Sequence, residues 1–267
     1  MTAASHAVSD SATLLRRNLR RLRRYPSLSL MLVGMPILFL LLFVWVFGGQ
    51  LSHGLSIPLA ADRAGRAGYL NYITPGIVLV TVAAAVQGTA IVVAMDMTGG
   101  IIDRFRTMAI ARSAVLTGHV LATLIQILGS LVVVIAVAVA LGFRPTADAA
   151  AWLATIGMIV SFSLALVWLA AALGLAAKSV ESASNTPMFL TLLPFLSSGF
   201  VPTATMPAGL RQFAEYQPFT PITETVRGLL TGTGIGTQAI AAIAWSLGIA
   251  VASYLWARRL YEHHIPR

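Results

Sequence analysis

The sequence contains no arrangement of residues that predicts catalysis by this chain. Lys178 is the only lysine and Ala177 precedes it, so the phosphate-binding pattern G-x-x-x-x-G-K-[ST] is absent. No serine stands in a G-x-S-x-G motif, which would present a nucleophile on a sharp turn. We therefore predict no catalytic residues, and any ATP that powers this protein must be bound by another chain.

Residue types that bind metals are equally sparse. The chain has no cysteine, which excludes disulfides and thiolate metal sites. His263 and His264 are adjacent near the C-terminus, and the other histidines are scattered without carboxylates at ligand spacing. The sequence therefore predicts no metal site and no cofactor bound by this chain.

The composition is that of a membrane protein. Hydrophobic residues make up 57% of the 267 residues and charged residues 10%, whereas soluble domains carry about 25% charged residues. A helix needs roughly 20 apolar residues to cross the hydrocarbon core. We predict an all-α membrane protein with six transmembrane helices, at about residues 28–48, 72–95, 115–141, 152–177, 187–201 and 239–257. The fifth is the shortest and contains Pro187 and Pro194.

Polar residues within these stretches are few. None of the six contains an aspartate, glutamate, lysine or arginine, which argues against a carrier driven by protons or ions, because such carriers usually hold charged groups at membrane depth. Gln87 lies in the second stretch and Asn185 just before the fifth. They could line a path for an apolar solute, or form hydrogen bonds between helices, which is the commoner role.

The basic residues predict an orientation. The net charge of +9 would favour nucleic acid in a soluble protein, but here the charges flank apolar stretches, so we expect no nucleic-acid partner. One side of the predicted topology carries thirteen basic residues: Arg16, Arg17, Arg20, Arg21, Arg23, Arg24, Arg104, Arg106, Arg112, Lys178, Arg258, Arg259 and Arg267. The other side carries five: Arg63, Arg66, Arg144, Arg211 and Arg227. This excess places both termini in the cytoplasm.

Residues 1–27 form a separate cytoplasmic segment. Leu15, Leu19 and Leu22 recur at helical spacing, and arginines fill most of the positions around them. This pattern predicts an interfacial amphipathic helix with its arginines toward anionic lipid, ended by Pro26. A plain charge cluster that sets the topology is the alternative interpretation.

The loop from Met95 to His119 contains a second short amphipathic helix. Gly99 and Gly100 can end the preceding span. Apolar residues then recur at helical spacing with charged residues between them. This helix could insert into a groove on a cytoplasmic partner, or it could lie on the membrane, and the pattern favours neither.

The last loop, residues 202–237, predicts two short helices. Pro207 and Pro221 can each begin one, and Gly232 can end the second. We expect a re-entrant pair that dips into the outer leaflet, where backbone must be covered by protein or face a wet cavity. The charged residues expected near that cavity are Glu215, Glu224 and Arg227. An ordinary folded cap with these charges in water is the alternative.

The order of these elements resembles the type-2 ABC exporter permeases. Two blocks are similar to the daunorubicin-resistance subfamily: GIIDRFRTMAIARSAVLTGH from Gly100 to His119, and NTPMFLTLLPFLSSGFVPTATMPAGLRQFAEYQPFTPITETVRGLLTG from Asn185 to Gly232. The resemblance covers nearly the whole chain, with residues 28–267 as the family's transmembrane domain. The chain departs from the expected Leu-Pro or similar pair after R-F-R-x, because it has Met108 and Ala109 there.

The resemblance implies a multi-pass permease of the bacterial cytoplasmic membrane that works as two copies on two ABC ATPase subunits, which hold ATP and Mg. Membrane lipid and a lipophilic substrate would be the other partners. Contact with the ATPase would fall to Ile101, Ile102, Asp103, Arg104, Phe105 and Arg106. The substrate path would include Gln87, Asn185, Phe189 and Phe195, and the extracellular gate Phe200, Glu215, Glu224 and Arg227.

The implied function is ATP-driven export of a lipophilic or amphipathic compound, either a drug or a lipid. Export of a lipid or polymer is an alternative within the same family. An ATP-independent carrier or channel, and a scaffold anchored through the basic N-terminal helix, are alternatives outside it. The sequence leaves the identity of the substrate open.

Overall fold

The computed structural model describes residues 26–48, 66–98, 112–177 and 179–263, and every regular element in them is helical. Two expected helices lie outside the described residues: the interfacial helix before Pro26, and the helix over residues 101–106 that is expected to contact the ATPase. Nothing in the structure therefore tests either prediction.

Four helices in the described part of the chain are long and apolar enough to cross a membrane. They are α4 (Arg66–Thr98), α6 (Arg112–Ala140), α7 (Ala149–Ala176) and α12 (Gln238–His263). Each corresponds to one predicted span, with shifted limits. Helix α7 begins after Asp148, because the Asp148 carboxylate accepts a hydrogen bond of 2.7 Å from the Ala151 N–H and caps the first turn.

The first apolar segment also agrees with its predicted span. Helix α2 (Pro26–Leu42) passes directly into a π-helical turn, η1 (Phe43–Phe47). A π-helical turn holds more residues than an α-helical one, so it rotates the side chains that follow. Trp45 of this turn stacks on the Arg66 guanidinium at the start of α4, 4.6 Å from Cζ to the ring centroid.

The fifth apolar segment is not the continuous helix expected over residues 187–201. It begins earlier and consists of α8 (Val180–Asn185), α9 (Met188–Leu192) and the 3₁₀-helix η3 (Leu193–Leu196). Pro187 stands at the break before α9, and Pro194 lies in the first turn of η3. Each proline lacks the N–H that would continue the helical ladder, which explains both interruptions. We call residues 180–196 the fifth segment.

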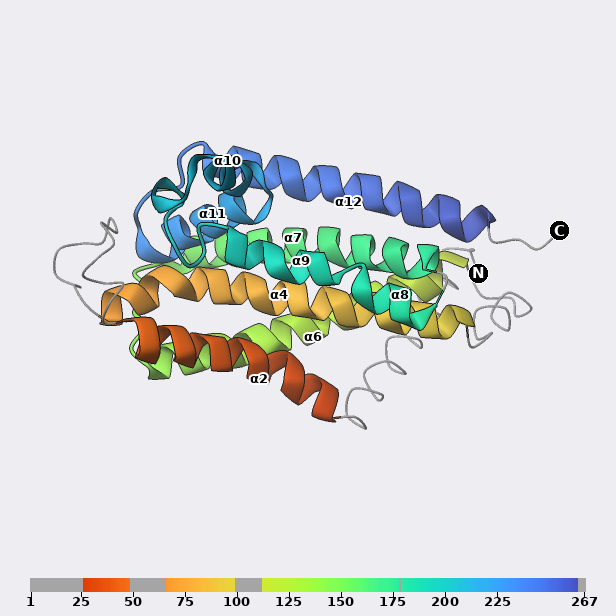
Figure 1. Ribbon diagram of the computed structural model, residues 1–267, viewed down its shortest axis with the longest axis horizontal. Helices are drawn as coiled ribbons and strands as arrows, with labels where there is room; N and C mark the ends of the chain where they lie inside the picture. Colours follow the sequence, from red (N-terminus) through yellow and green to blue (C-terminus); the bar gives the residue numbers. More distant parts are fainter. Residues whose placement is uncertain (1–25, 49–65, 99–111, 178, 264–267) are drawn as a thin grey trace.

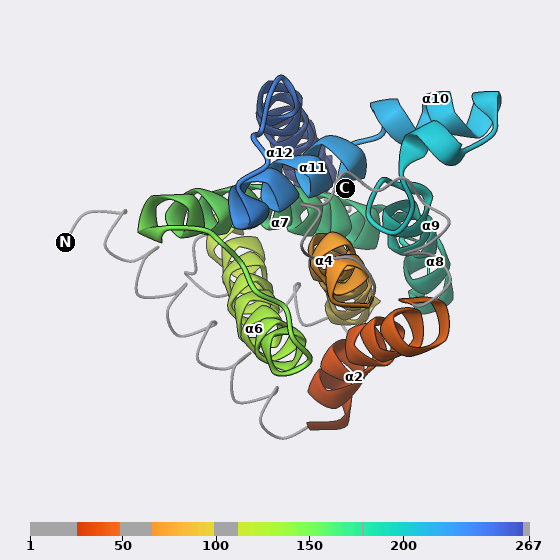
Figure 2. The same ribbon diagram turned by 90° about the vertical axis from the view of Figure 1, so that its left-hand side faces the viewer.

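Helix α4 is the centre of the bundle (Figure 2). It contacts α2, α6, α7, α11 and the fifth segment. Gly174 of α7 allows one close crossing, because a Cβ there would lie 2.7 Å from the Ala90 carbonyl oxygen of α4. Helix α12 packs mainly on α7. In Figure 1 the successive apolar segments run in alternating directions along the long axis.

A small cap lies at one end of the bundle, drawn on the left in Figure 1. It comprises η4 (Thr203–Thr205), α10 (Ala208–Tyr216) and α11 (Phe219–Thr231). Pro207 precedes α10 and Gly232 ends α11 with a φ of 72°, both as predicted. The predicted start of the second helix at Pro221 is wrong, because α11 begins two residues earlier, after Pro218. Pro221 fits there because first-turn N–H groups need no helical acceptor.

Candidate functional site

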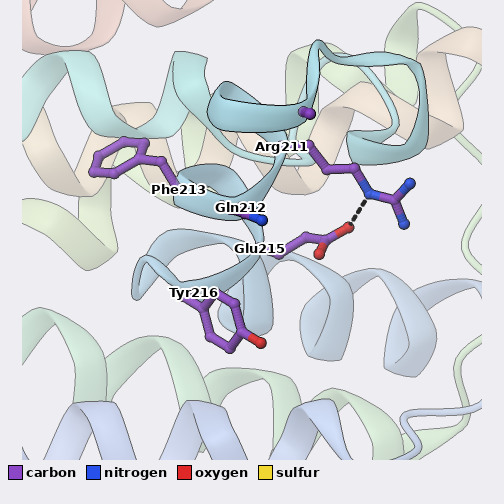
Figure 3. A pocket seen from close by; sticks show the side chains of 6 residues that line it. Arg211, Gln212, Phe213, Glu215 and Tyr216 are labelled. Atoms are coloured by element: carbon purple, nitrogen blue, oxygen red, sulfur yellow. Dashed lines mark hydrogen bonds and ion pairs between the residues drawn. The ribbon is translucent and has the colours of Figure 1, made fainter.

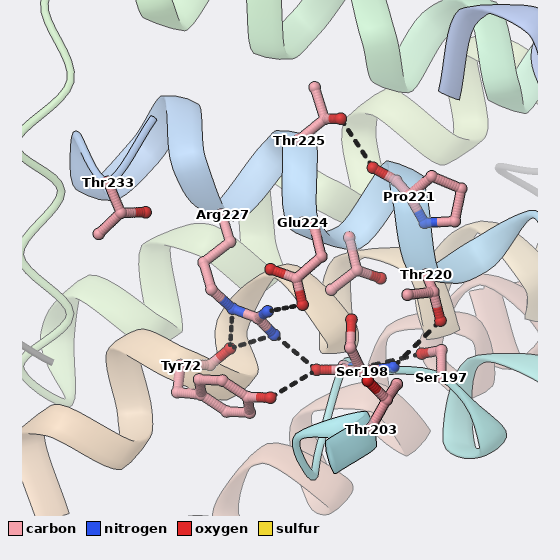
Figure 4. Close-up of polar contacts among 12 residues, drawn as sticks. Tyr72, Ser197, Ser198, Thr203, Thr220, Pro221, Glu224, Thr225, Arg227 and Thr233 are labelled. Carbon is pink, nitrogen blue, oxygen red and sulfur yellow. Dashed lines mark hydrogen bonds and ion pairs between the residues drawn. The ribbon is translucent and has the colours of Figure 1, made fainter. Parts of the chain in front are cut away.

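A buried arginine connects the cap to the centre of the bundle. Arg227 of α11 is 8% exposed, and its side chain points toward α4 and the end of the fifth segment (Figure 4). Its Nε and Nη2 each donate to the Tyr72 carbonyl oxygen at 3.2 Å, and Nη2 also donates to the Ser198 carbonyl oxygen at 2.7 Å. Nη1 pairs with the Glu224 carboxylate at 2.6 Å. We call these four residues the Arg227 cluster.

Tyr72 contributes its side chain as well as its carbonyl group. Its hydroxyl donates to the Ser198 carbonyl oxygen at 2.9 Å, and its ring lies 3.9 Å from the Arg227 Cζ. Tyr72 lies three residues before Pro75, which has no N–H for the Asn71 carbonyl one turn earlier. Membrane helices tolerate such prolines where neighbouring groups supply hydrogen bonds to the local backbone. Arg227 supplies two of them in this turn of α4.

The turn that follows the fifth segment touches α4 directly, backbone against backbone. A Cβ on Gly76 would lie 2.7 Å from the Gly199 carbonyl oxygen and 2.9 Å from the Gly199 Cα. Ordinary side chains do not approach that closely, so glycine is required on the α4 side of this contact. The contact lies next to Pro75 and the Arg227 hydrogen bonds.

The turn formed by residues 197–199 is buried, and each of its three backbone N–H groups donates a hydrogen bond. The Ser197 hydroxyl donates to the Pro194 carbonyl and accepts from the Gly199 N–H. The Ser198 N–H donates to the Thr220 hydroxyl at 3.2 Å. The Ser198 hydroxyl is 2% exposed and has no hydrogen-bond partner. We call this element the 197–199 turn.

Aromatic rings beside this turn join the fifth segment to the first. Phe195 and Phe200 stack with their centroids 5.0 Å apart and their planes inclined by 14°. Phe39 of α2 meets the Phe195 ring edge-on at 5.2 Å, and Phe43 of η1 lies 4.7 Å from Phe200. Contacts of this kind add to the energy of burial, so the first and fifth segments pack together at the capped end.

The structure brings together four of the residues predicted for the path and the gate: Phe195, Phe200, Glu224 and Arg227. The other path residues lie elsewhere. The Gln87 amide donates to the Ser184 carbonyl oxygen at 3.2 Å, which is the helix-to-helix role considered above. Asn185 is exposed, and Phe189 is 74% exposed on α9.

Glu215 is separate from the Arg227 cluster. It pairs with Arg211 at 2.7 Å on the exposed side of α10, where both border a shallow hollow (Figure 3). The hollow is lined by Ala208, Arg211, Gln212, Phe213, Glu215 and Tyr216. All six belong to α10, so this hollow is an open surface of one helix and does not enclose a ligand.

Sequence reasoning missed the partners of Arg227. Tyr72 and Ser198 are separated from it by 155 and 29 residues, and no local pattern links such positions. The adjacent Pro75 and Gly76 inside an apolar stretch were the available signal of a close backbone approach. In the described residues the site holds no nucleophile beside a base and no group of three metal-ligating side chains. The contacts of Arg227 position the backbone of α4 and of the turn that follows the fifth segment.

Comparisons with known proteins agree with this description. A family model described as ABC-2 type transporter matches residues 11–231. The daunorubicin resistance ABC transporter permease protein DrrB1 of Streptomyces coeruleorubidus is 27% identical over 262 residues, covering 98% of this chain and 89% of the relative. The probable doxorubicin resistance ABC transporter permease protein DrrC of Mycobacterium tuberculosis is 25% identical over 246 residues, covering 90% and 84%. The chain is thus a membrane permease that belongs to the ABC-2 type transporter family.

Proposed function

We propose that this chain is the transmembrane permease subunit of an ATP-driven ABC exporter in the bacterial cytoplasmic membrane. The observation that carries the proposal is a relationship over 98% of the chain to a protein named as an ABC transporter permease. The sequence supports the need for a separate ATPase, because its single lysine is not in a phosphate-binding loop. Two copies of the permease and two ATPase subunits, which carry ATP and Mg, complete the transporter.

In this proposal all six apolar segments cross the membrane. Their alternating directions in Figure 1 support an arrangement with both termini on one face, and the excess of basic residues favours the cytoplasm for that face. The cap then lies on the outer side. The fifth segment has 17 residues if its breaks are ignored, about 25 Å of helix, which is shorter than the hydrocarbon core of about 30 Å. This difference supports a cap that dips into the outer leaflet as a re-entrant pair.

The burial of Arg227 supports a position of the cap within the outer leaflet. A charged group within a membrane must be satisfied by protein or reach water, and Arg227 has carbonyl, carboxylate and aromatic partners. Tyr216 and Phe213 on the exposed side of α10 are 77% and 48% exposed. Aromatic residues are frequent at the membrane interface, which supports α10 lying at the outer boundary.

The substrate we propose is a lipophilic or amphipathic compound that passes between two copies of the permease. Large apolar side chains stand exposed along α2, η1 and α9, among them Leu38, Trp45 and Phe189. These apolar side chains offer burial to a solute that passes along them, which favours an apolar or amphipathic compound. The names of the relatives include drug resistance, and that property is stated only for those proteins. Export of a lipid or polymer is the alternative function for this chain.

Energy would enter through the segment that contains Arg104 and Arg106, which we assign to the contact with the ATPase. Closure of the ATPases on ATP can shift the permease only through contacts that differ between its two states. The double variant Arg104→Ala, Arg106→Ala is expected to uncouple transport while expression stays normal. Arg258→Ala, Arg259→Ala is the matched control, since it removes two basic residues from the same predicted side.

The experiment is co-expression with the ATPase encoded beside this chain, purification in lipid, and measurement of ATP hydrolysis with candidate lipophilic compounds. We expect co-purification and compound-stimulated hydrolysis that is lost in the Arg104, Arg106 double variant and kept in the control. Normal coupling in that variant would refute the assigned contact. Failure of any ATPase to associate would favour a carrier or a scaffold, and stimulation by lipids alone would favour the lipid exporter.

A further inference from the structure

A long-range attachment lies at the capped end of the fifth segment, at the 197–199 turn that follows it. There the 197–199 turn meets α4 at Gly76 and is held by hydrogen bonds from Arg227, Tyr72 and Thr220. We propose that Arg227 is the positioning residue that holds this turn on α4, and that its release allows the first and fifth segments to separate together from α4. This inference concerns a motion within one subunit and does not depend on the proposed export activity.

The geometry requires a guanidinium group. Arginine has five N–H donors in a fixed plane, and four hydrogen bonds leave this one toward Tyr72, Ser198 and Glu224. They join α11, α4 and the 197–199 turn through one side chain. A lysine ammonium keeps the charge but is a compact point donor that cannot span three elements. Arg227→Lys therefore weakens the attachment while it preserves the charge.

The turn is built to move as a unit. Its internal hydrogen bonds, from Ser197 to Pro194 and from Gly199 to Ser197, are local and survive a separation from α4. The rings of Phe195 and Phe200 flank the turn and pack on Phe39 and Phe43 of the first segment. Loss of the Arg227 hydrogen bonds frees the turn from α11 and α11 from α4, but it removes none of these ring contacts. The first and fifth segments therefore stay together when the turn is released.

Ser198 offers a direct measurement of this release. Its hydroxyl is buried and has no partner, so Ser198→Cys removes no hydrogen bond. The chain has no native cysteine, so the new thiol is the only one. The purified full-length protein in lipid nanodiscs, open on both faces, is treated with a polar maleimide, and the labelling rate reports how often the turn opens. We expect Arg227→Lys to raise this rate at least about tenfold, because a hydrogen bond to a charged group is lost.

Two further variants keep the test decisive. Tyr72→Phe removes one neutral hydrogen bond to Ser198 and retains the ring under Arg227, so the labelling rate should rise about two- to tenfold. Ser163→Cys on α7 is the matched control, because Ser163 is also fully buried with an unpartnered hydroxyl. Its labelling should not change with Arg227→Lys. Equal acceleration at both thiols, or no acceleration at Ser198→Cys in either variant, would overturn the proposal.

Discussion

Replacement of Gly76 by alanine tests the direct contact between α4 and the 197–199 turn. The added Cβ would stand 2.7 Å from the Gly199 carbonyl oxygen, whereas ordinary contacts begin at 3.4 Å. Backbone on both sides cannot rotate away, so the two elements must separate by about 0.7 Å. The same shift would stretch the Tyr72 hydroxyl bond to the Ser198 carbonyl oxygen from 2.9 Å beyond the normal limit of about 3.0 Å for such a bond.

Two costs follow from this separation. Overpacking of a tight contact costs about 1–3 kcal/mol, and a lost hydrogen bond between neutral groups costs about 0.5–1.5 kcal/mol. We expect Gly76→Ala to lower the free energy of unfolding by about 1.5–4.5 kcal/mol. Gly88→Ala on the same helix is the control, because a Cβ there meets nothing within 4 Å and alanine favours the helix by up to about 1 kcal/mol.

The assay is reversible unfolding in mixed micelles, titrated with sodium dodecyl sulfate and followed by the helical circular dichroism signal. Both glycine variants and the parent are measured under identical lipid and detergent conditions. A Gly76→Ala protein as stable as the Gly88→Ala protein would refute the backbone contact, and with it the close packing of the fifth segment on α4.

Other changes give graded outcomes in the same assay. Gly174→Ala should cost about 1–3 kcal/mol, because its Cβ would press on the Ala90 carbonyl; an unchanged midpoint would contradict the crossing of α7 and α4. Phe200→Ala should cost about 3–5 kcal/mol because the ring is buried in the aromatic group. Phe189→Ala removes an exposed ring and should change the stability by no more than about 0.5 kcal/mol. Equal effects of the two substitutions would disprove the assigned burial. Arg211→Ala breaks an exposed ion pair, so a loss above about 1 kcal/mol would be unexpected.

Much of the fold could be predicted because it depends on local features. Long apolar runs indicated the helices now seen as α2, α4, α6, α7 and α12. Pro207 and Gly232 marked the start of α10 and the end of α11, since a proline before a helix and a glycine after it act through their own backbone. The fifth segment was located but not resolved into its pieces, although Pro187 and Pro194 were visible in it.

The candidate site was predicted only in part. Arg227 and Glu224 were singled out as charges near the cavity expected at the re-entrant pair, and Phe195 and Phe200 from the resemblance to the exporter permeases. The separation of Glu215 from this group was not foreseen, because Glu215 instead forms an exposed ion pair with Arg211 within α10. The sequence left two roles open for Gln87, lining a solute path or joining helices. Its hydrogen bond to Ser184 joins α4 to α8.

The sequence by itself determined that this chain is a helical membrane protein without its own nucleotide-binding loop. Apolar run length, the single Lys178 and the absence of cysteine are properties of the chain alone. Only the tertiary structure decided that Arg227 is buried on Tyr72, that the 197–199 turn receives its hydrogen bonds, and that Gly76 lies against Gly199. These pairs lie far apart along the chain, and their contacts exist only because packing around α4 brings separate segments together, which no local pattern encodes.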